Sequence, residues 1–388
     1  QGVAPDGPGM SANGNLDFDA VVVGGGISGC TTALHLARGG MRVAVLEAGS
    51  LCRAASNANA GTLSMQIKRA ALVPYSMRSW ELWKTAPQWL GRDVGFTVQG
   101  GLTLAYDDEE ADMLEIRMGE RRDAGAPIEF IGLERAQEIE PGLSGHARLI
   151  AYCPMDAFSD TLVIGHAYRA ALAADGVAIH ESSPVAGIER DGDGFAVATG
   201  ESIIRTRRVV LAGGVWLGRM LAWFGHDVPV ECGVDMVSVT ESMPPIMRTV
   251  IGAASGLLTI KQKANGSVLI GGGWKGIGDI DMGGVEVIPG NLIGNLRLAH
   301  YTIPKLAEAR VTRTWLGMDA NMPDFMPLVG PVPGAEGAFV IGCIRGGYTI
   351  GPYMGWLLAE QILGREPEMP LFDMSRYVSD QPREKDKD

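Results

Sequence analysis

The feature that most constrains the fold is the run VVVGGGISGC, which occupies Val21–Cys30. The apolar residues Ala20–Val23 in front of the glycines predict a buried parallel strand. Ile27–Arg38 then carries apolar residues at helical spacing, and Arg42–Leu46 predicts a second buried strand. Strand, helix and strand make one β-α-β unit of about 30 residues. The sequence therefore predicts an α/β fold with a Rossmann-like domain.

The glycines in this unit have the spacing of a dinucleotide site. Gly24 permits the tight turn, Gly26 lets the backbone approach a pyrophosphate, and Gly29 allows the helix to pack closely on the sheet. Free N–H groups at the helix N-terminus favour the same anion. Glu47 ends the second strand, where a carboxylate can bind the adenosine ribose and disfavours a 2′-phosphate. The alternative is a tight turn without a ligand. It does not explain why the strand, the helix and the acidic residue all occur where a dinucleotide site requires them. The β-α-β unit therefore predicts a binding site for FAD or NAD.

Composition narrows the class of protein. The chain has 388 residues, of which 46% are hydrophobic and 20% charged, as expected for a globular protein of two domains. Its formal net charge of -12 argues against a nucleic-acid partner. No apolar run has transmembrane length and no signal peptide is evident, so a cytoplasmic protein is expected. The five cysteines and six histidines lack ligand spacing, and no metal is expected.

Five stretches after Glu47 form an ordered series. They are SNANAGTLS at 56–64, FTVQGGLTLAYDDEEADML at 96–114, VVLAGGVW at 209–216, MPDFMPLVGPVPG at 322–334 and GGYTIGPYMGWLLAEQILG at 346–364. In this series the chain resembles the D-amino-acid oxidase (DAO) superfamily of FAD enzymes, which includes glycine oxidase, sarcosine oxidase and opine or proline dehydrogenase subunits. The resemblance implies FAD in place of NAD, and oxidation of a C–N bond by hydride transfer from the substrate α-carbon to flavin N5. Trp315 stands where sarcosine oxidases carry a flavin-linked cysteine, so the FAD is expected to be non-covalent.

The order of these stretches implies a discontinuous FAD-binding domain formed by 16–64, 145–216 and 322–370. An α+β substrate domain with a mostly antiparallel sheet is expected from 65–144 and 217–321. Residues 1–15 are expected to be disordered or vector-derived, and 371–388 to form a tail. The predicted FAD-binding residues are Gly24, Gly26, Ile27, Ser28, Gly29, Glu47, Ala48, Ser56, Asn59, Ala60, Gly61, Thr62, Val185, Ala212, Gly213, Trp216, Gly346, Gly347, Tyr348, Thr349 and Ile350.

Several local elements can also be predicted. Strand-like runs occur at 96–106, 228–241, 257–262 and 267–273, and Thr161–Ala174 has the pattern of an amphipathic helix. The glycine-rich stretch GGGWKGIGDIDMGG at 271–284 lacks a β-α-β context. We expect a hairpin or lid loop near the substrate there, not a phosphate site.

Arg345, in GCIRGGYT, is the leading candidate for substrate binding. The resemblance implies that it lies beside the flavin, as in glycine oxidase-like members, and a guanidinium can clamp a carboxylate through two parallel hydrogen bonds. An exposed loop arginine is the alternative. Tyr348 could supplement the clamp or point elsewhere. His226 and His300 could act as bases, although a lone histidine is more often structural.

The segment WLGMDANMPD departs from the family pattern, because Met318 and Asp319 stand where many members carry an arginine. A two-arginine clamp for a simple amino acid is therefore doubtful. Asp319 would favour a cationic group on the substrate if it faces the pocket, and an exposed position is the alternative.

The sequence is compatible with three functions. VECGVDMVSVTESMPP at 230–245 resembles the catalytic β-type subunits of opine or proline dehydrogenases and heteromeric sarcosine oxidases. That resemblance implies partner subunits with further redox centres, and leaves open an FMN at a subunit interface. The alternatives are a stand-alone oxidase that makes hydrogen peroxide and a flavin-binding scaffold without activity.

Overall fold

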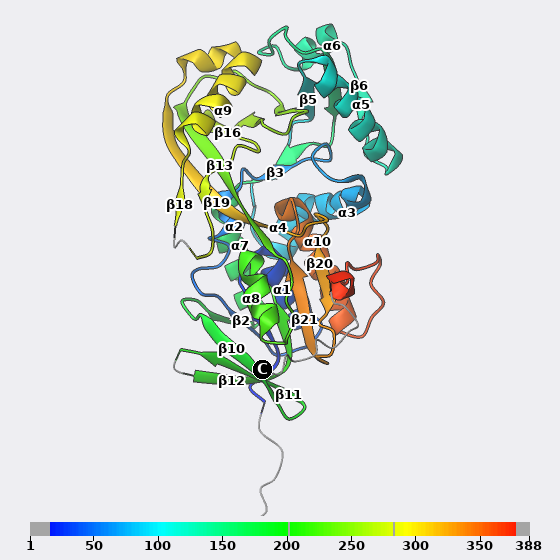
Figure 1. The fold of residues 1–388 in the computed structure, drawn as a ribbon, viewed down its shortest axis with the longest axis vertical. Coiled ribbons are helices and arrows are strands. Elements are labelled where there is room, and N and C mark those ends of the chain that lie inside the picture. Colours follow the sequence, from blue (N-terminus) through cyan, green and yellow to red (C-terminus); the bar gives the residue numbers. More distant parts are fainter. Residues whose placement is uncertain (1–15, 201, 282–283, 378–388) are drawn as a thin grey trace, which may run out of the picture.

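The computed structural model describes residues 16–200, 202–281 and 284–377, which form two large sheets and the helices packed on them (Figure 1). The first sheet lies in the half of the molecule with α1 and β10–β12, and the second sheet lies in the half with α9 and α6. The predicted segment 1–15 and the end of the predicted tail, 378–388, lie outside the described residues.

The first sheet is mixed, with a parallel centre. β1 runs parallel to both β2 and β12, β9 is parallel to β2, and β21 is parallel to β12. β10, β11 and β12 form antiparallel pairs, as do β20 and β21. The strands are β1 (Phe18–Val23), β2 (Val43–Leu46), β9 (Ala178–His180), β10 (Val185–Asp191), β11 (Gly194–Thr199), β12 (Ser202–Leu211), β20 (Leu328–Pro331) and β21 (Ala338–Gly342).

The predicted β-α-β unit is confirmed. β1 starts two residues before the predicted strand, α1 spans Ile27–Arg38 as predicted, and β2 begins at Val43. All residues of Ala20–Val23 and Val43–Leu46 are buried, because both faces of a parallel strand are covered. Because β1 and β2 are parallel, the loops that follow them emerge at the same edge of the sheet.

A second helix, α10 (Gly347–Ile362), lies directly against α1. Glycines make the approach close: a Cβ at Gly355 would lie 2.8 Å from the Ser28 carbonyl oxygen, and one at Gly351 would lie 2.9 Å from the Ser28 hydroxyl. The remaining helices are α2 (Ala55–Ala58), α3 (Val73–Lys84), α4 (Ala86–Leu90), α5 (Asp108–Asp123), α6 (Leu133–Ile139), α7 (Thr161–Ala174), α8 (Leu217–Ala222) and α9 (Pro289–Thr302).

The second sheet has the order β19-β13-β16-β15-β14-β5-β7-β6, and its pairs are antiparallel except for β14 with β5. This matches the expected mostly antiparallel sheet. Its strands are β5 (Gly101–Ala105), β6 (Glu129–Phe130), β7 (Leu149–Cys153), β13 (Glu231–Ser242), β14 (Val250–Ala253), β15 (Thr259–Gln262), β16 (Ser267–Gly271) and β19 (Val311–Asn321).

Most predicted local elements are present with small shifts. The predicted run 96–106 is divided into β4 (Thr97–Val98) and β5, because Gly100 adopts a φ of 69° between them. α7 matches its predicted bounds, and its N-cap Asp160 accepts a hydrogen bond from the Leu162 N–H at 3.0 Å. Two short strands, β3 (Thr62–Leu63) and β8 (Ala157–Phe158), join β4 in a small sheet.

The glycine-rich stretch 271–284 includes the first strand of a short hairpin, as predicted. β17 (Ile277–Gly278) pairs antiparallel with β18 (Val285–Glu286), and residues 282–283 between them lie outside the described residues. Among the helices formed by residues that the structure describes, none combines the length and apolarity of a membrane span.

Candidate active site

A cavity of about 1830 Å³ lies between the two sheets. Its wall includes Val23 and Leu46 at the carboxyl ends of β1 and β2, and Met236 and Leu316 from β13 and β19 of the second sheet. Pockets for one drug-sized ligand enclose roughly 300–1,000 Å³. The cavity is therefore large enough for a dinucleotide and a second, smaller molecule.

Most of the predicted FAD-binding residues line this one cavity. They are Gly24, Gly26, Ile27, Ser28, Gly29, Glu47, Ala48, Ser56, Asn59, Ala60, Thr62, Val185, Ala212, Gly213, Trp216, Gly346, Gly347, Tyr348 and Thr349. Two predicted residues lie behind the wall instead. Ile350 is fully buried in the apolar core beneath α10, and Gly61 packs on the protein, where its Cβ would lie 2.3 Å from the Ser159 carbonyl oxygen.

Glycine is required for different structural reasons at Gly24, Gly26 and Gly29. Gly24 adopts a φ of 113°, and a Cβ there would lie 2.3 Å from the Ala212 carbonyl oxygen. A Cβ on Gly29 would lie 2.2 Å from the Gly24 carbonyl oxygen. At Gly26 the one neighbour within 4 Å of a Cβ is the Ser56 hydroxyl, at 3.5 Å. Gly24 and Gly29 are thus required by the protein itself, whereas Gly26 leaves its backbone open to the cavity.

The N-terminus of α1 at this wall offers free donors. Its N-cap, Gly26, provides no side-chain hydrogen bond, and no acidic residue lies in the first turn. The Ile27 N–H donates to the Ser56 hydroxyl at 3.1 Å. Ser28 and Gly29, which follow, also line the cavity. Their N–H groups and the helix dipole can therefore bind an anion in the cavity.

Glu47 is held at the end of β2 by backbone donors. One carboxylate oxygen accepts from the Gly25 N–H at 2.7 Å and the other from the Gly49 N–H at 2.7 Å. Each oxygen of an ionised carboxylate has a second lone pair. Glu47 can therefore keep these bonds and also accept hydrogen bonds from two hydroxyl groups of a ligand.

The loop containing Ser56 and Asn59 is also self-supporting. The Asn59 side-chain oxygen accepts from the Gly61 N–H at 2.7 Å, and its amide nitrogen donates to the carbonyl oxygens of Ala55 and Ser56, both at 2.9 Å. These bonds use most of the capacity of the Asn59 amide. The asparagine shapes the loop, and Ala60 and Thr62 beside it line the cavity.

Arg345 lies in the cavity wall between β21 and α10 and is exposed. In the described part of the chain it forms no ion pair. Its guanidinium carbon lies 5.1 Å from the centre of the Phe325 ring. A guanidinium that packs on an aromatic ring can still donate hydrogen bonds from its N–H groups. Arg345 can therefore bind an anion in the cavity.

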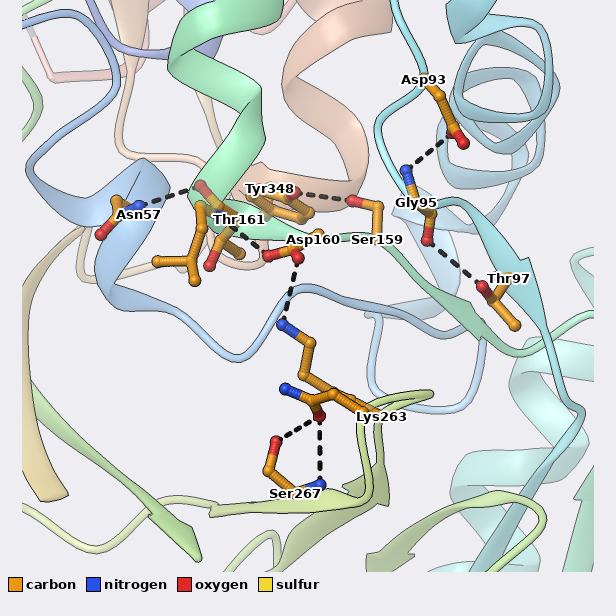
Figure 2. Close-up of polar contacts among 12 residues, drawn as sticks. Asn57, Asp93, Gly95, Thr97, Ser159, Asp160, Thr161, Lys263, Ser267 and Tyr348 are labelled. Atoms are coloured by element: carbon orange, nitrogen blue, oxygen red, sulfur yellow. Dashed lines mark hydrogen bonds and ion pairs between the residues drawn. The ribbon is translucent and has the colours of Figure 1, made fainter. Parts of the chain in front are cut away.

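The Tyr348 hydroxyl is hydrogen-bonded within the protein. Figure 2 shows its hydroxyl directed at Ser159, with 2.6 Å between the two oxygens. Its ring stacks on the buried Trp83 with 4.8 Å between ring centres. The Ser159 bond and the stacking give Tyr348 a structural role, and we do not include its hydroxyl in the proposed clamp.

Asp319 lies in the same wall and is half-buried. Burial and the neighbouring Asp235 raise the pKa of its carboxyl to about 6, although Arg345 and Lys275 act in the opposite direction. Asp319 is therefore negatively charged at neutral pH and can attract a cationic group in the cavity.

Sequence reasoning missed six further cations in the wall, which are Arg53, Arg219 and the four described next. Lys68 and Arg69 lie just before the short helix η1 (Ala70–Leu72), and Arg117 and Arg121 lie on α5. With Arg345 they are called the basic cluster below. The spacing of Arg117 and Arg121 on one helix face was the available signal, but surface helices commonly carry such pairs.

Two other expectations concern bases and metals. His226 and His300 are outside the cavity wall, and His226 is hydrogen-bonded through Nε2 to the Pro333 carbonyl oxygen at 2.8 Å. Within the described ranges, no three His, Cys, Asp or Glu side chains gather as metal ligands would.

Comparison with known proteins identifies the family of the chain. The family model described as DAO, FAD dependent oxidoreductase, matches residues 19–361. The chain belongs to this family. It is an FAD-dependent oxidoreductase, and the predicted family resemblance is confirmed.

Individual relatives extend along nearly the whole chain. The glycine oxidase of Geobacillus kaustophilus is 28% identical over 372 residues, which cover 93% of this chain and 97% of the relative. An opine oxidase subunit of Rhizobium meliloti is 27% identical over 378 residues, with coverage of 94% and 99%. The crystal structure of L-proline dehydrogenase from P. horikoshii matches with a TM-score of 0.84 and 26% identity, covering 92% of this chain and 96% of that one.

The residues of the cavity fit the cofactor of this family. The open backbone at Gly26 and the uncapped α1 N-terminus suit the pyrophosphate of FAD. Glu47 retains acceptor capacity for ribose hydroxyls. Gly346 and Gly347, at the N-terminus of α10, line the same cavity.

Proposed function

We propose that this enzyme oxidises the C–N bond of a small amino acid, imino acid or opine. The observation that carries the proposal is Arg345, a guanidinium without an ion pair in the described part of the chain, in the cavity that also contains the glycine turn after β1. Bound FAD would supply the electron acceptor for this oxidation. The relatives named as a glycine oxidase and as part of an opine oxidase support the same substrate class.

The protein side chains would contribute position and charge. Arg345, in the loop before α10, would hold the substrate carboxylate, and Asp319 would face the substrate amine from β19. Neither residue needs to act as a base, because orientation of the C–H bond supplies much of the acceleration in such sites. The FAD-binding roles proposed above for Gly26, Ser28 and Glu47 complete the site.

We further propose that the chain is the catalytic β-type subunit of a heteromeric dehydrogenase. The segment 230–245, which contains β13, carries the pattern of those subunits, and the opine oxidase relative from Rhizobium meliloti covers 94% of this chain. Partner subunits would then carry further redox centres, and this arrangement leaves open an FMN at a subunit interface. All five cysteines are free thiols, as expected in the reducing cytoplasm, where we place the enzyme.

A stand-alone oxidase is the second candidate, because glycine oxidase of Geobacillus kaustophilus is 28% identical to this chain. The two candidates differ in the electron acceptor. An oxidase passes electrons to oxygen, whereas the catalytic component of a heteromeric dehydrogenase passes them to a partner.

The test is anaerobic mixing of the purified flavoprotein with opines, imino acids and amino acids, followed by admission of air. Bleaching of the oxidised flavin band by one class supports C–N oxidation. Rapid return of the band in air then indicates an oxidase, and slow return indicates a dehydrogenase. If FAD is bound but no compound bleaches it, the proposal is overturned in favour of a flavin-binding scaffold.

A further inference from the structure

The basic cluster places five cations around one part of the cavity, and they come from three separate segments of the chain. Lys68 and Arg69 precede η1, Arg117 and Arg121 lie on α5, and Arg345 precedes α10. A single guanidinium can already bind both oxygens of one carboxylate through two parallel hydrogen bonds. The number of cations therefore exceeds what a substrate with a single carboxylate can use.

No member of the basic cluster takes part in an ion pair within the described residues. Two other cations in or beside this wall do have partners, since Arg219 pairs with Asp281, and Lys275 with Asp235 at 2.5 Å. Arg53, which also lines the wall, is exposed and has no ion pair within the described residues. Within the cluster Lys68 is the buried member, whereas Arg69, Arg117 and Arg345 are exposed. A buried cation without an ion-pair partner costs free energy, so an anion in the cavity would be stabilised beside Lys68.

Lys68 is the most buried member, with 2% of its surface exposed. Its Nζ donates to the Gly346 carbonyl oxygen at 3.4 Å, and a Cβ on Gly346 would lie only 2.3 Å from that nitrogen. The ammonium group therefore lies against the residue that follows Arg345. An ammonium has three donors, so Lys68 can bind an anion while it keeps this bond.

Other contacts connect the members. The Arg121 Nε donates to the backbone carbonyl oxygen of Lys68. The guanidinium carbons of Arg69 and Arg345 lie 4.9 and 5.1 Å from the centre of the same Phe325 ring. Lys68 and Arg121 thus form one side of a group whose other side is Arg345.

The charge on Lys68 is retained at neutral pH. Burial lowers the pKa of its ammonium to about 8, while the carboxylates of Asp156 and Asp319 raise it and Arg345 and Arg121 lower it. Asp156 does not form an ion pair with Lys68 in the described structure. Its carboxylate is instead bonded to Ser64 at 2.6 Å.

We propose that Lys68 and Arg121 form a second carboxylate subsite, and that the preferred substrates are secondary amines with a carboxylate on each arm. This inference rests on the proposed function. Arg345 holds the carboxylate on the carbon that is oxidised, and Lys68 with Arg121 holds the carboxylate of the other arm. An amine with one carboxylate leaves Lys68 without an anion.

The experiment measures binding of two unreactive probes to the FAD-loaded enzyme through the change in flavin absorbance. Thiodiacetate carries two carboxylates and methylthioacetate carries one. Sulfur replaces the amine nitrogen in both, so C–N oxidation is impossible. We expect thiodiacetate to bind about 10- to 100-fold more tightly, the range for one additional hydrogen-bonded charge.

Three variants locate this preference. Lys68→Met and Arg121→Gln should each reduce thiodiacetate affinity about tenfold and leave methylthioacetate affinity nearly unchanged. Lys68→Arg should restore the preference. Arg122→Gln is the matched control, because Arg122 follows Arg121 on α5 but is exposed and outside the cavity wall.

Equal affinity of the wild-type enzyme for the two probes would overturn the subsite. Equal losses for both probes in Lys68→Met and Arg121→Gln would overturn it as well. If Lys68→Met does not retain FAD, the probe affinities of Arg121→Gln alone test the subsite.

Failure of the proposed function gives a different result from failure of the subsite. If the proposed function is wrong, neither sarcosine nor iminodiacetate bleaches the flavin. If only the subsite is wrong, sarcosine still bleaches the flavin and the two probes bind with equal affinity.

Discussion

The two ends of the cavity are built on different principles. The nucleotide end is formed by backbone: the turn at Gly24–Gly29, the N-terminus of α1, and a carboxylate, Glu47, that two N–H groups already hold. The substrate end is formed by long charged side chains without ion pairs in the described residues, of which Lys68 and Arg345 are the clearest. The protein's own hydrogen bonds hold the first end before a ligand arrives, whereas the cations of the second end have no ion-pair partner until an anionic ligand binds.

The largest expected effect is on protein stability, from substitution in the glycine turn. Gly24→Ala should lower the free energy of unfolding by about 2–4 kcal/mol, because φ is 113° and the Cβ would collide with Ala212. Gly26→Ala should leave the unfolding of the apoprotein nearly unchanged but weaken FAD binding about 10- to 100-fold. Thermal unfolding with and without FAD, together with flavin titration, measures both. Equal behaviour of the two variants would contradict the division between protein-packing and ligand-facing glycines.

The next effect concerns the substrate end. Arg345→Ala should lower kcat/KM for a carboxylate substrate about 100-fold and leave the FAD content unchanged, because the exposed guanidinium contacts the Phe325 ring and has no ion-pair partner in the described chain. Arg345→Lys should retain part of the activity, since it keeps the charge but not the fork of donors. Steady-state kinetics and flavin absorbance provide the two readouts. An unchanged rate in the alanine variant would remove Arg345 from the site.

A smaller effect is expected of pH on the affinity for thiodiacetate. Lys68 loses its proton above a pKa of about 8, a value lowered mainly by burial. The dissociation constant of thiodiacetate should therefore be constant at neutral pH and rise above about pH 8, by at most about tenfold per pH unit. The Lys68→Arg variant should show no such rise, because a guanidinium stays charged. A pH-dependent rise that persists in this variant would assign the titration to another group.

The smallest effect is expected at Asp319. Its carboxyl, with a pKa raised to about 6 mainly by burial, becomes neutral in mild acid and then loses its attraction for a cationic amine. We expect kcat/KM to fall less than about tenfold between about pH 7 and about pH 5. Asp319→Asn should remove this acid limb and lower the rate at neutral pH by a few-fold at most. If the variant keeps the same acid limb, Asp319 is not the titrating group.

Local patterns were sufficient for the nucleotide end. The strand, glycine turn, helix and terminal acid are consecutive, and their geometry follows from steric limits and hydrogen bonding within about 30 residues. The bounds of α1 and α7 were predicted for the same reason, since each has helical spacing of apolar residues and a recognisable end. Gly61 shows the limit of motif reasoning. It belongs to the loop pattern that resembles the family, but its position is required by the Ser159 carbonyl oxygen and not by the cavity.

The sequence by itself determined the family, the cofactor and the β-α-β unit. The β-α-β unit depends on consecutive residues. The family and its cofactor were recognised from short motifs spread over residues 56–364, each of which can be identified without knowing how the motifs pack together. Only the tertiary structure decided that Tyr348 binds Ser159 and that Lys68, Arg121 and Arg345 meet around one cavity. These three cations are far apart in sequence, on segments that also carry ordinary surface charges. Whether a charged side chain is solvated or faces a ligand is set by how the sheets and helices pack, and no local pattern encodes that packing.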